Sequence, residues 1–441
     1  MKAVAKKNVL SGHITVPGSK SHTIRALILA SMAEGVSHIS NPLPSNDCLS
    51  TAKAVDQIGG KVTMQENVWI VNGAGKNLHL PEKQIDVGNS GSLMYFLSPV
   101  LSTLKGKCTF TGDESICRRP VNHLIDSLNQ LGAKASCLNN DSTPPFSFEG
   151  PIDVNKKLVT GGELSQYISG FMMAATRLDG ELKLSLTNPK ETPYLTMTKM
   201  WLESVGAQVF VSEDFKTISV KGPLVIQGFD RAVPSDWEGV AFPLVAALIT
   251  NSHIIIDNID SSGSQGDDKI VDVLKSVGAD IEWDKQKNQL IVQGGKVLST
   301  KKLTDGVLKI NMSGFPDAIC ALAVAACFIE GKTIFTDIDI CRKKETDRIK
   351  AMESELSKLG ADIRDEGDIL VVNGNGGKNL CGGAVESYKD HRIVMALSCL
   401  GLALKEGEKL TVSDAQWCSV TFPNFFEEMN KLGANFELIE K

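Results

Sequence analysis

The sequence predicts an α/β protein built from six copies of one structural unit, arranged in two lobes of three copies each. The first observation is a step that occurs six times: a helix-like stretch ends in a hydrophobic residue, a glycine and a small residue, and a β-like run follows. The second is the spacing of these glycines, which lie 73, 74, 72, 82 and 73 residues apart. The six glycines are Gly59, Gly132, Gly206, Gly278, Gly360 and Gly433.

Each of these steps is typical of the end of a helix. A glycine just after the last helical turn adopts the left-handed backbone conformation at little cost, and a short alternating strand after it can pair with its neighbours. Five intervals of similar length favour six copies of one unit over coincidence.

Two places in the chain are predicted to be crossings between the lobes. One lies at residues 232–235, between the third and fourth copies, and the other at Pro17-Gly18. The strand expected at Gly12–Pro17 then belongs with the C-terminal half of the chain. The predicted lobes are residues 1–17 with 235–441, and residues 18–234, with a ligand site expected in the cleft between them.

Composition excludes several classes of function. Apolar residues make up 42% and charged residues 22% of the 441 residues, as in ordinary globular proteins. The net charge of −6 provides no basic field for nucleic acid, so no nucleic-acid partner is expected. The longest near-continuous apolar run, residues 318–329, is too short to span a bilayer, and no signal peptide is recognised at the N-terminus, so no membrane partner is expected.

The ten cysteines include no CxxC pair, and HExxH, P-loop and GxGxxG motifs are absent. This pattern predicts reduced thiols in a cytoplasmic protein, without a metal site or an organic cofactor.

The candidate functional residues lie in segments that lead into predicted helices. In residues 16–25, Ser19 or Ser21 is expected to cap a helix, while Lys20 and Arg25 oppose the positive end of its dipole. A bound anion would remove that conflict.

Similar features recur in the first half of the chain. The small-residue loop at 88–92 precedes an apolar helix and would allow close approach of a phosphate, and Arg118 and Arg119 before Pro120 favour an anion clamp. Ser165-Gln166 open a helix at 167–175, where simple capping is an equal alternative.

In the second half, Asp317 stands before an apolar helix predicted at 318–329, either as a helix stabiliser or as a catalytic group. Lys344 and Arg348 lead an amphipathic helix, and Asp390-His391-Arg392 begin an apolar helix at 393–404.

Together these segments resemble the enolpyruvyl transferases, most closely the branch that acts on shikimate 3-phosphate. The motifs occur in the family's order and spacing: VPGSKS, GNSGS, GDESxxxRP, SQY, PDA, KETDR, DHR and TFPNFF. The resemblance spans from Ser11 to about Ala434. It implies a two-lobed inverse α/β barrel of six βαβαββ units, three per lobe. It also implies transfer of the enolpyruvyl group of phosphoenolpyruvate to the 5-hydroxyl of shikimate 3-phosphate, with release of phosphate.

The resemblance also implies roles for individual residues. The implied catalytic residues are Asp317 as proton acceptor, Glu345 as proton donor and Lys20 at the site of bond formation. Among the ligands of shikimate 3-phosphate, Ser21 and Arg25 hold chiefly the carboxylate, and Ser165 holds the phosphate. The implied shikimate 3-phosphate ligands are Lys20, Ser21, Arg25, Ser165, Gln166, Asp317 and Lys344. The implied phosphoenolpyruvate ligands are Lys20, Gly91, Arg119, Gln166, Arg348 and Arg392. No cofactor or metal is implied, and a monomer is expected.

Some positions depart from the family pattern. Val420, Tyr95 and Ile340 replace a lysine, an arginine and an asparagine, while Leu164 and Glu191 replace small polar residues. These changes weaken the phosphate contacts and leave the catalytic carboxylates intact, which indicates a divergent member.

Two alternatives remain at this stage. One is the sister transferase acting on UDP-N-acetylglucosamine, which generally carries a reactive Cys or Asp five residues before the arginine of its loop. This chain has Glu114 there, and Cys117 lies only two residues before Arg119. The other is a non-catalytic anion-binding paralogue, which would not require both carboxylates.

Overall fold

Each of the six glycine steps ends a helix in the structure, a computed structural model that describes residues 1–139 and 141–440. The φ angles of the six glycines lie between 91° and 102°, in the left-handed region. The helices before them are α2 (Asn46–Gln57), α4 (Asn122–Gln130), α6 (Thr192–Ser204), α8 (Lys269–Ser276), α10 (Arg348–Lys358) and α12 (Phe425–Lys431). The strands after them are β4 (Lys61–Met64), β8 (Lys134–Cys137), β12 (Gln208–Val211), β16 (Asp280–Asp284), β20 (Ile363–Asp365) and β24 (Glu437–Ile439). The predicted repeat is confirmed.

The described residues form six four-stranded sheets with one common pattern of pairing. In each sheet, one strand runs parallel to its neighbour, and the other two pairings are antiparallel. The sheet of β18 (Val307–Asn311), β19 (Gly331–Thr336), β21 (Leu370–Gly374) and β20 illustrates the pattern, with Ile310 opposite Phe335 in the parallel pair. This is the pairing of a βαβαββ unit, as the sequence predicts.

Three of the sheets belong to a compact unit, here called unit 2, that comprises Gly18–Val233. Its inner helices are almost wholly buried, because they lack a polar face: α1 (Lys20–Met32), α3 (Gly91–Leu101) and α5 (Ser165–Ala175). Its remaining strands are β3 (Val36–Ser40), β5 (Val68–Asn72), β6 (Ile85–Asp86), β7 (Gly106–Thr111), β9 (Phe146–Gly150), β10 (Leu158–Thr160), β11 (Gly180–Leu186), β13 (Thr217–Gly222) and β14 (Asp230–Ala232).

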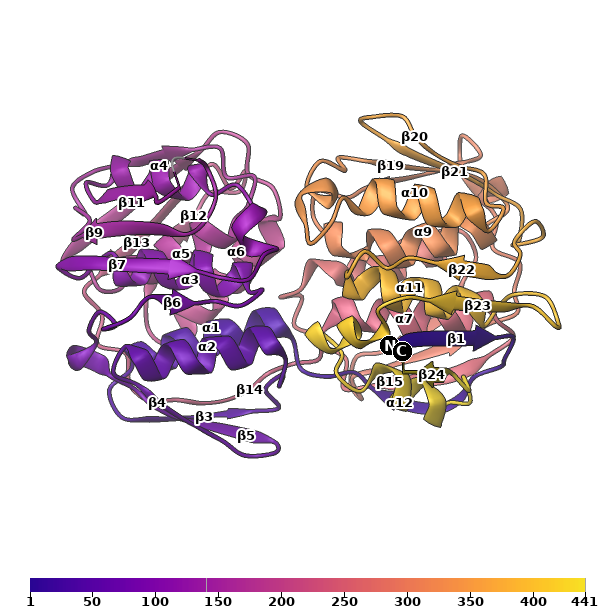
Figure 1. Cartoon of the computed structure of the whole chain (residues 1–441), viewed down its shortest axis with the longest axis horizontal. Coiled ribbons are helices and arrows are strands. Elements are labelled where there is room, and N and C mark those ends of the chain that lie inside the picture. Colours follow the sequence, from indigo (N-terminus) through magenta and orange to yellow (C-terminus); the bar gives the residue numbers. More distant parts are fainter. Residues whose placement is uncertain (140, 441) are drawn as a thin grey trace. The chain divides into compact units, whose positions relative to one another are not determined.

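The other three sheets belong to unit 1, which joins Met1–Pro17 to the chain from Pro234 onward. Its inner helices pack against one another: α7 (Trp237–Ile249), α9 (Ile319–Phe328) and α11 (His391–Gly401). Its remaining strands are β1 (Lys2–Lys6), β2 (Ser11–Thr15), β15 (His253–Asp257), β17 (Gln289–Gln293), β22 (Gly383–Val385) and β23 (Lys409–Val412). In Figure 1 the indigo strand β1 lies beside the yellow strand β23, with both chain ends close by.

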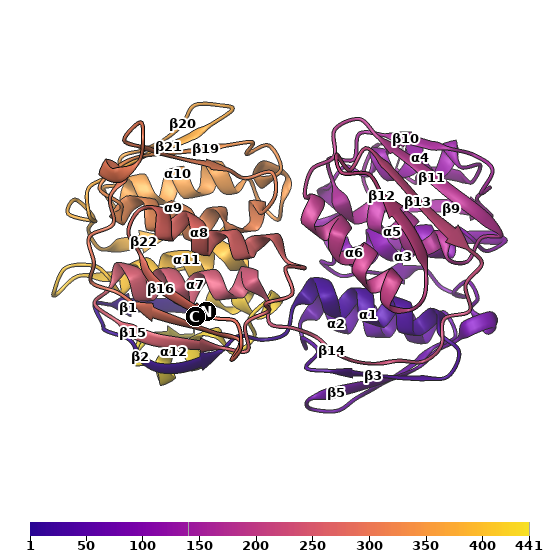
Figure 2. The ribbon, with the colours of Figure 1, turned by 180° about the vertical axis from the view of Figure 1, so that it is seen from behind.

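The chain exchanges strands where it passes between the units. Strand β2 precedes α1 in the sequence but pairs in parallel with β15, which follows α7 (Figure 2). Conversely, β14 precedes α7 but pairs in parallel with β3, which follows α1. Each unit therefore completes its own three sheets and contains its own apolar core.

Candidate active site

The candidate residues of unit 1 meet at the N-terminal ends of its helices. Asp317 lies in a short 3-10 turn, η5 (Pro316–Ala318), directly before α9. Its carboxylate accepts hydrogen bonds from Lys344 Nζ at 3.2 Å and Arg348 Nη1 at 2.5 Å, and it lies 3.2 Å from Arg392 Nε. Burial raises the pKa of Asp317, but the charges of Lys344 and Arg348 lower it by more, and the net shift is downward. Asp317 is therefore held as a carboxylate.

Arg348, the first residue of α10, binds three carboxylates through one guanidinium group. In addition to Asp317, it donates to Glu345 Oε2 from Nη2 at 2.7 Å and to Asp390 Oδ2 from Nε at 2.8 Å. Its side chain is 0% exposed. Burial lowers the pKa of Arg348, but Asp390, Glu345 and Asp317 together raise it well above its usual value. The two carboxylates to which the resemblance gives catalytic roles, Asp317 and Glu345, are thus held side by side on the two terminal nitrogens of one arginine.

Arg392 joins this cluster from the start of α11. The carboxylate of Asp390 caps that helix by accepting a hydrogen bond from the Arg392 backbone N–H at 2.9 Å. The Arg392 guanidinium pairs with Glu238, a buried residue in the first turn of α7. The N-terminal ends of four helices therefore converge through charged side chains.

The cluster in unit 1 carries its own counter-ions. Its cations Lys344, Arg348 and Arg392 are matched by nearby carboxylates, which belong to Asp317, Glu345, Asp390 and Glu238. An anionic substrate would have to compete with these carboxylates for the cations.

In unit 2, Lys20 is the first residue of α1, and its Nζ lies 3.5 Å from Asp47 Oδ2 at the start of α2. The sequence predicted that Ser19 or Ser21 caps α1. Ser19 occupies the capping position, but its side chain makes no capping hydrogen bond, and Ser21 lies inside the helix. The conflict between Lys20 and the helix dipole is met by Asp47 from the same unit.

Arg25 is buried, and no carboxylate within residues 1–139 and 141–440 hydrogen-bonds to it. It donates from Nε to Thr198 Oγ1 at 2.8 Å, from Nη1 to Ser21 O at 2.9 Å and from Nη2 to Tyr194 O at 3.2 Å. Its guanidinium carbon lies 4.5 Å from the centre of the Phe96 ring. Burial lowers the pKa of Arg25 to about 9, although Tyr194 acts in the opposite direction. Arg25 is a positive charge suited to an external anion.

Gly91, Arg119 and Gln166 gather at the start of α3. Arg119 Nη1 lies 3.4 Å from the position that a β-carbon on Gly91 would take, so a side chain at 91 would contact the guanidinium. Arg119 Nη2 donates to Asn89 Oδ1 at 3.4 Å, and Gln166 Nε2 donates to Ser92 Oγ at 3.2 Å. The structure thus brings together three residues that the resemblance assigns to phosphoenolpyruvate.

The predicted clamp of two adjacent arginines is wrong. Arg118 is 69% exposed and pairs with Glu114 at 3.3 Å, whereas Arg119 turns toward the loop before α3. Arg118 is the last residue of a 3-10 turn, η2 (Ile116–Arg118), and Arg119 follows it in an extended conformation.

Ser165, the first residue of α5, is engaged by a carboxylate of the same unit. Its backbone N–H and its hydroxyl both donate to Glu191 Oε2, at 3.2 Å and 3.1 Å. Glu191 precedes α6 and has a positive φ of 50°. Both donors that Ser165 would offer to a phosphate are therefore directed at an internal anion.

Four other departures from the family pattern are apolar or aromatic residues. Tyr95, Ile340 and Val420 are buried, and Leu164 is half-buried at the start of α5. The Tyr95 hydroxyl donates a long hydrogen bond, 3.5 Å, to Pro120 O.

Asp47 and Glu238 were not among the residues predicted from the sequence, and Glu191 was identified only as a departure from the family pattern. Asp47 and Glu238 each lie in the first turn of a helix at a buried position. Acidic residues in a first turn are a recognisable signal. Their basic partners are distant in sequence, however, so spacing alone does not reveal these pairs.

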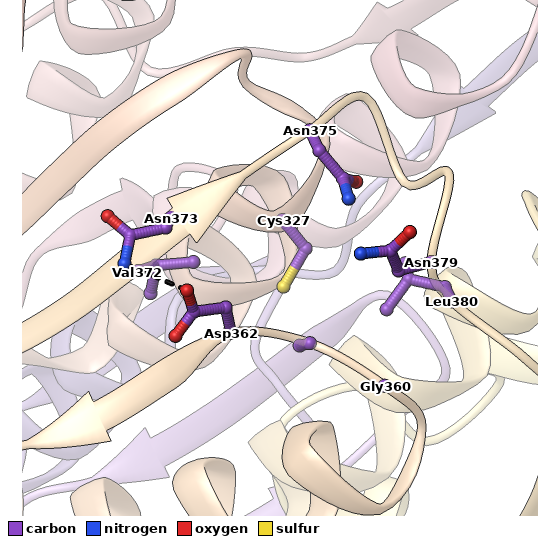
Figure 3. A pocket seen from close by; sticks show the side chains of 9 residues that line it. Cys327, Gly360, Asp362, Val372, Asn373, Asn375, Asn379 and Leu380 are labelled. Carbon is purple, nitrogen blue, oxygen red and sulfur yellow. Dashed lines mark hydrogen bonds between the residues drawn. The ribbon is translucent and has the colours of Figure 1, made fainter.

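A separate cavity of about 160 Å³ lies near the C-terminal end of α9 (Figure 3). Asp317 lies just before the other end of that helix. Figure 3 shows the Cys327 sulfur and the side-chain amides of Asn375 and Asn379 directed toward this space. Burial raises the pKa of Cys327 to about 12, so the thiol stays protonated at neutral pH. None of the predicted site residues lines this cavity.

Among the residues that the structure describes, no three His, Cys, Asp or Glu side chains are grouped so as to hold a metal ion. In the same residues, no helix combines the length and the apolar character needed to cross a membrane.

Comparison with known proteins supplies the family. The model of the family EPSP synthase (3-phosphoshikimate 1-carboxyvinyltransferase) matches residues 4–429. The 3-phosphoshikimate 1-carboxyvinyltransferase of Ruminiclostridium cellulolyticum is 35% identical over 440 residues, covering 98% of this chain and 99% of the relative. That of Methanocaldococcus jannaschii is also 35% identical over 440 residues, covering 99% of each chain. The solved structure of EPSP synthase from Acinetobacter baumannii superposes with a TM-score of 0.82 at 26% identity, covering 100% of both chains. The chain belongs to the EPSP synthase (3-phosphoshikimate 1-carboxyvinyltransferase) family.

Proposed function

We propose that this protein transfers the enolpyruvyl group of phosphoenolpyruvate to the 5-hydroxyl of shikimate 3-phosphate. The products are 5-enolpyruvylshikimate 3-phosphate and inorganic phosphate. The observation that carries the proposal is the pairing of Asp317 and Glu345 on Arg348, in a chain whose family match extends along nearly its whole length. A protein that only bound anions would have no need for two adjacent carboxylates.

The reaction has two stages, an addition followed by an elimination. In the addition, the 5-hydroxyl oxygen bonds to C2 of phosphoenolpyruvate, its proton leaves, and a proton joins C3 to form a methyl group. In the elimination, C2 loses phosphate and the methyl group returns a proton, which restores the double bond. Each stage needs a group that accepts a proton and a group that donates one.

In unit 1, Asp317 is assigned to accept the 5-hydroxyl proton, because its lowered pKa keeps it ionised. Glu345, whose carboxylate must first take up a proton from solvent, is assigned to deliver that proton to C3. Arg348 fixes both carboxylates, since a planar guanidinium holds its two terminal nitrogens at a constant separation. Arg392 then supplies positive charge to a substrate anion that displaces Glu238, and Lys344 supplies positive charge while Asp317 stays on Arg348.

In unit 2, Arg25 is assigned to the shikimate carboxylate together with Ser21, since it is buried against neutral partners. Gly91, Arg119 and Gln166 are assigned to phosphoenolpyruvate, and Lys20 to both substrates. Ser165 is assigned to the shikimate phosphate, with Gln166 between the substrates. Residues of both units therefore serve the same two substrates.

The decisive experiment measures phosphate release with each substrate alone and with both together. Phosphate is expected only when shikimate 3-phosphate and phosphoenolpyruvate are both present. Equal turnover with UDP-N-acetylglucosamine in place of shikimate 3-phosphate would reject the assignment. Arg118→Gln is a control variant that should retain the parent's rate, because Arg118 is exposed and pairs with the exposed Glu114.

Two further properties complete the proposal. The protein is a monomer, for which light scattering should give a mass near 47.5 kDa at all concentrations tested. It acts in the cytoplasm, which suits its ten free thiols, and cell fractionation should recover it with cytosolic markers.

A further inference from the structure

We propose that Glu191 is a specificity-determining residue that occupies the phosphate-binding position at Ser165 and must leave it before shikimate 3-phosphate binds. This inference rests on the proposed function, since Ser165 is assigned to the shikimate phosphate only by that reaction.

The geometry of the contact supports this role. One oxygen of Glu191 accepts from both the backbone N–H and the hydroxyl of Ser165, at 3.2 Å and 3.1 Å. A phosphate oxygen bound at the first turn of a helix uses the same two kinds of donor. Both residues are buried, Ser165 to 1% and Glu191 to 3% exposure. A dianionic phosphate and this carboxylate cannot share the two donors.

The position of Glu191 explains why a carboxylate is stable there. Glu191 is the residue before α6, yet its side chain does not cap that helix and turns instead to the start of α5. The N-terminal ends of two helices are therefore close to one negative charge, and each end favours an anion. A serine at position 191 would leave the positive potential of both ends available to an external phosphate.

Glu191 therefore competes with the phosphate group of shikimate 3-phosphate, and with no other group of the substrates. Binding of the shikimate phosphate must break two hydrogen bonds to a charged acceptor and move the carboxylate away. The hydroxyl and carboxylate of shikimate do not involve Ser165 in this scheme. The competition should therefore affect ligands that carry the phosphate and spare those that lack it.

The test compares Glu191→Gln and Glu191→Ser with the parent by calorimetric titration. Glutamine removes the charge but keeps the size, while serine removes both. The dissociation constant for shikimate 3-phosphate should fall about 10- to 100-fold in the serine variant, as expected when an internal charged hydrogen-bond partner is removed, and by a smaller factor in the glutamine variant. Inorganic phosphate should also bind more tightly, whereas the affinity for shikimate and the KM for phosphoenolpyruvate should change less than about twofold.

Glu163→Gln is the matched control, because Glu163 precedes α5 on the same segment but pairs with Asn188. It should leave the affinity for shikimate 3-phosphate unchanged. Unchanged or weaker binding of shikimate 3-phosphate and inorganic phosphate in Glu191→Gln, with parental thermal stability, would overturn the inference even if the serine variant did not fold. A parent that releases no phosphate from the two substrates would instead reject the proposed function, and the titration with inorganic phosphate would still decide the role of Glu191.

Discussion

Removal of the Arg348 guanidinium should destabilise unit 1 severely. In Arg348→Met the side chain keeps an apolar stem but loses the guanidinium, so Asp317, Glu345 and Asp390 lose their shared partner. The Asp390 side chain is 0% exposed, so its charge would remain buried without that cation. Breaking a buried ion pair by removing one partner typically costs about 3–5 kcal/mol. For a unit of this size each kcal/mol lowers Tm by about 2–4 °C, so a fall of about 6–20 °C is expected.

Differential scanning calorimetry at neutral pH measures this loss directly. The matched control is Arg364→Met, since Arg364 is 69% exposed and pairs with Asp362 at 3.4 Å on the surface. Exposed pairs contribute less than about 1 kcal/mol, so the control should shift Tm by less than about 4 °C.

A second variant separates the buried charge from general damage to the core. Asp390→Asn removes one carboxylate but keeps an oxygen that can cap α11 through the Arg392 N–H. In the double variant with Arg348→Met, the loss should be smaller than the sum of the single losses by about 0.5–3 kcal/mol. A Tm for Arg348→Met within 2 °C of the parent, or simple additivity with Asp390→Asn, would refute this account of the cluster.

Other variants test the site and the stability of the fold. Asp317→Asn should lower kcat by about 10²–10⁴-fold, far more than it lowers substrate affinity, because the amide cannot accept the proton; a rate within fivefold of the parent would remove Asp317 from that role. Val420→Lys should tighten glyphosate, a phosphonate mimic of phosphoenolpyruvate, by about tenfold or more in the presence of shikimate 3-phosphate. An unchanged dissociation constant in folded protein would mean that position 420 does not face the ligand. For Glu355, burial raises the pKa, but hydrogen bonds from Lys358 and Tyr388 lower it by more. The unfolded chain then binds this proton at a higher pH than the folded protein, so stability is lost as pH falls below about 4.5, and urea midpoints of Glu355→Gln should lose less than the parent's between pH 5 and pH 3.

The sequence predicted the repeating architecture because its signals are local. A glycine such as Gly132 has a positive φ directly after the helix that it ends. The left-handed backbone conformation therefore favours glycine at that single position, and this preference can be identified in the sequence. The helix starts that carry Lys20, Asp317 and Arg348 were identified for the same reason.

The partners of the charged residues could not be predicted in this way. The sequence indicated that Lys20 and Arg392 bind anions, but in the structure they pair with the carboxylates of Asp47 and Glu238. Glu238 is 154 residues from Arg392 in the chain, and only the packing of α7 against α11 brings them together. The local sequence shows that a basic residue stands at the positive end of a helix dipole. Which acidic group pairs with that residue depends on tertiary packing.

The exchange of strands between the two units determines the order in which a growing chain can fold. All of unit 2 lies in one continuous stretch, so its three sheets can close soon after residue 233 is synthesised. Strand β1, the first to be synthesised, must wait for β23 and β24, near the end of the chain. During that interval β1 has two unpaired edges, which favour association with other chains. Unit 1 is therefore expected to be the slower and more aggregation-prone half during synthesis, and loss of the last few residues would leave one edge of β1 permanently open.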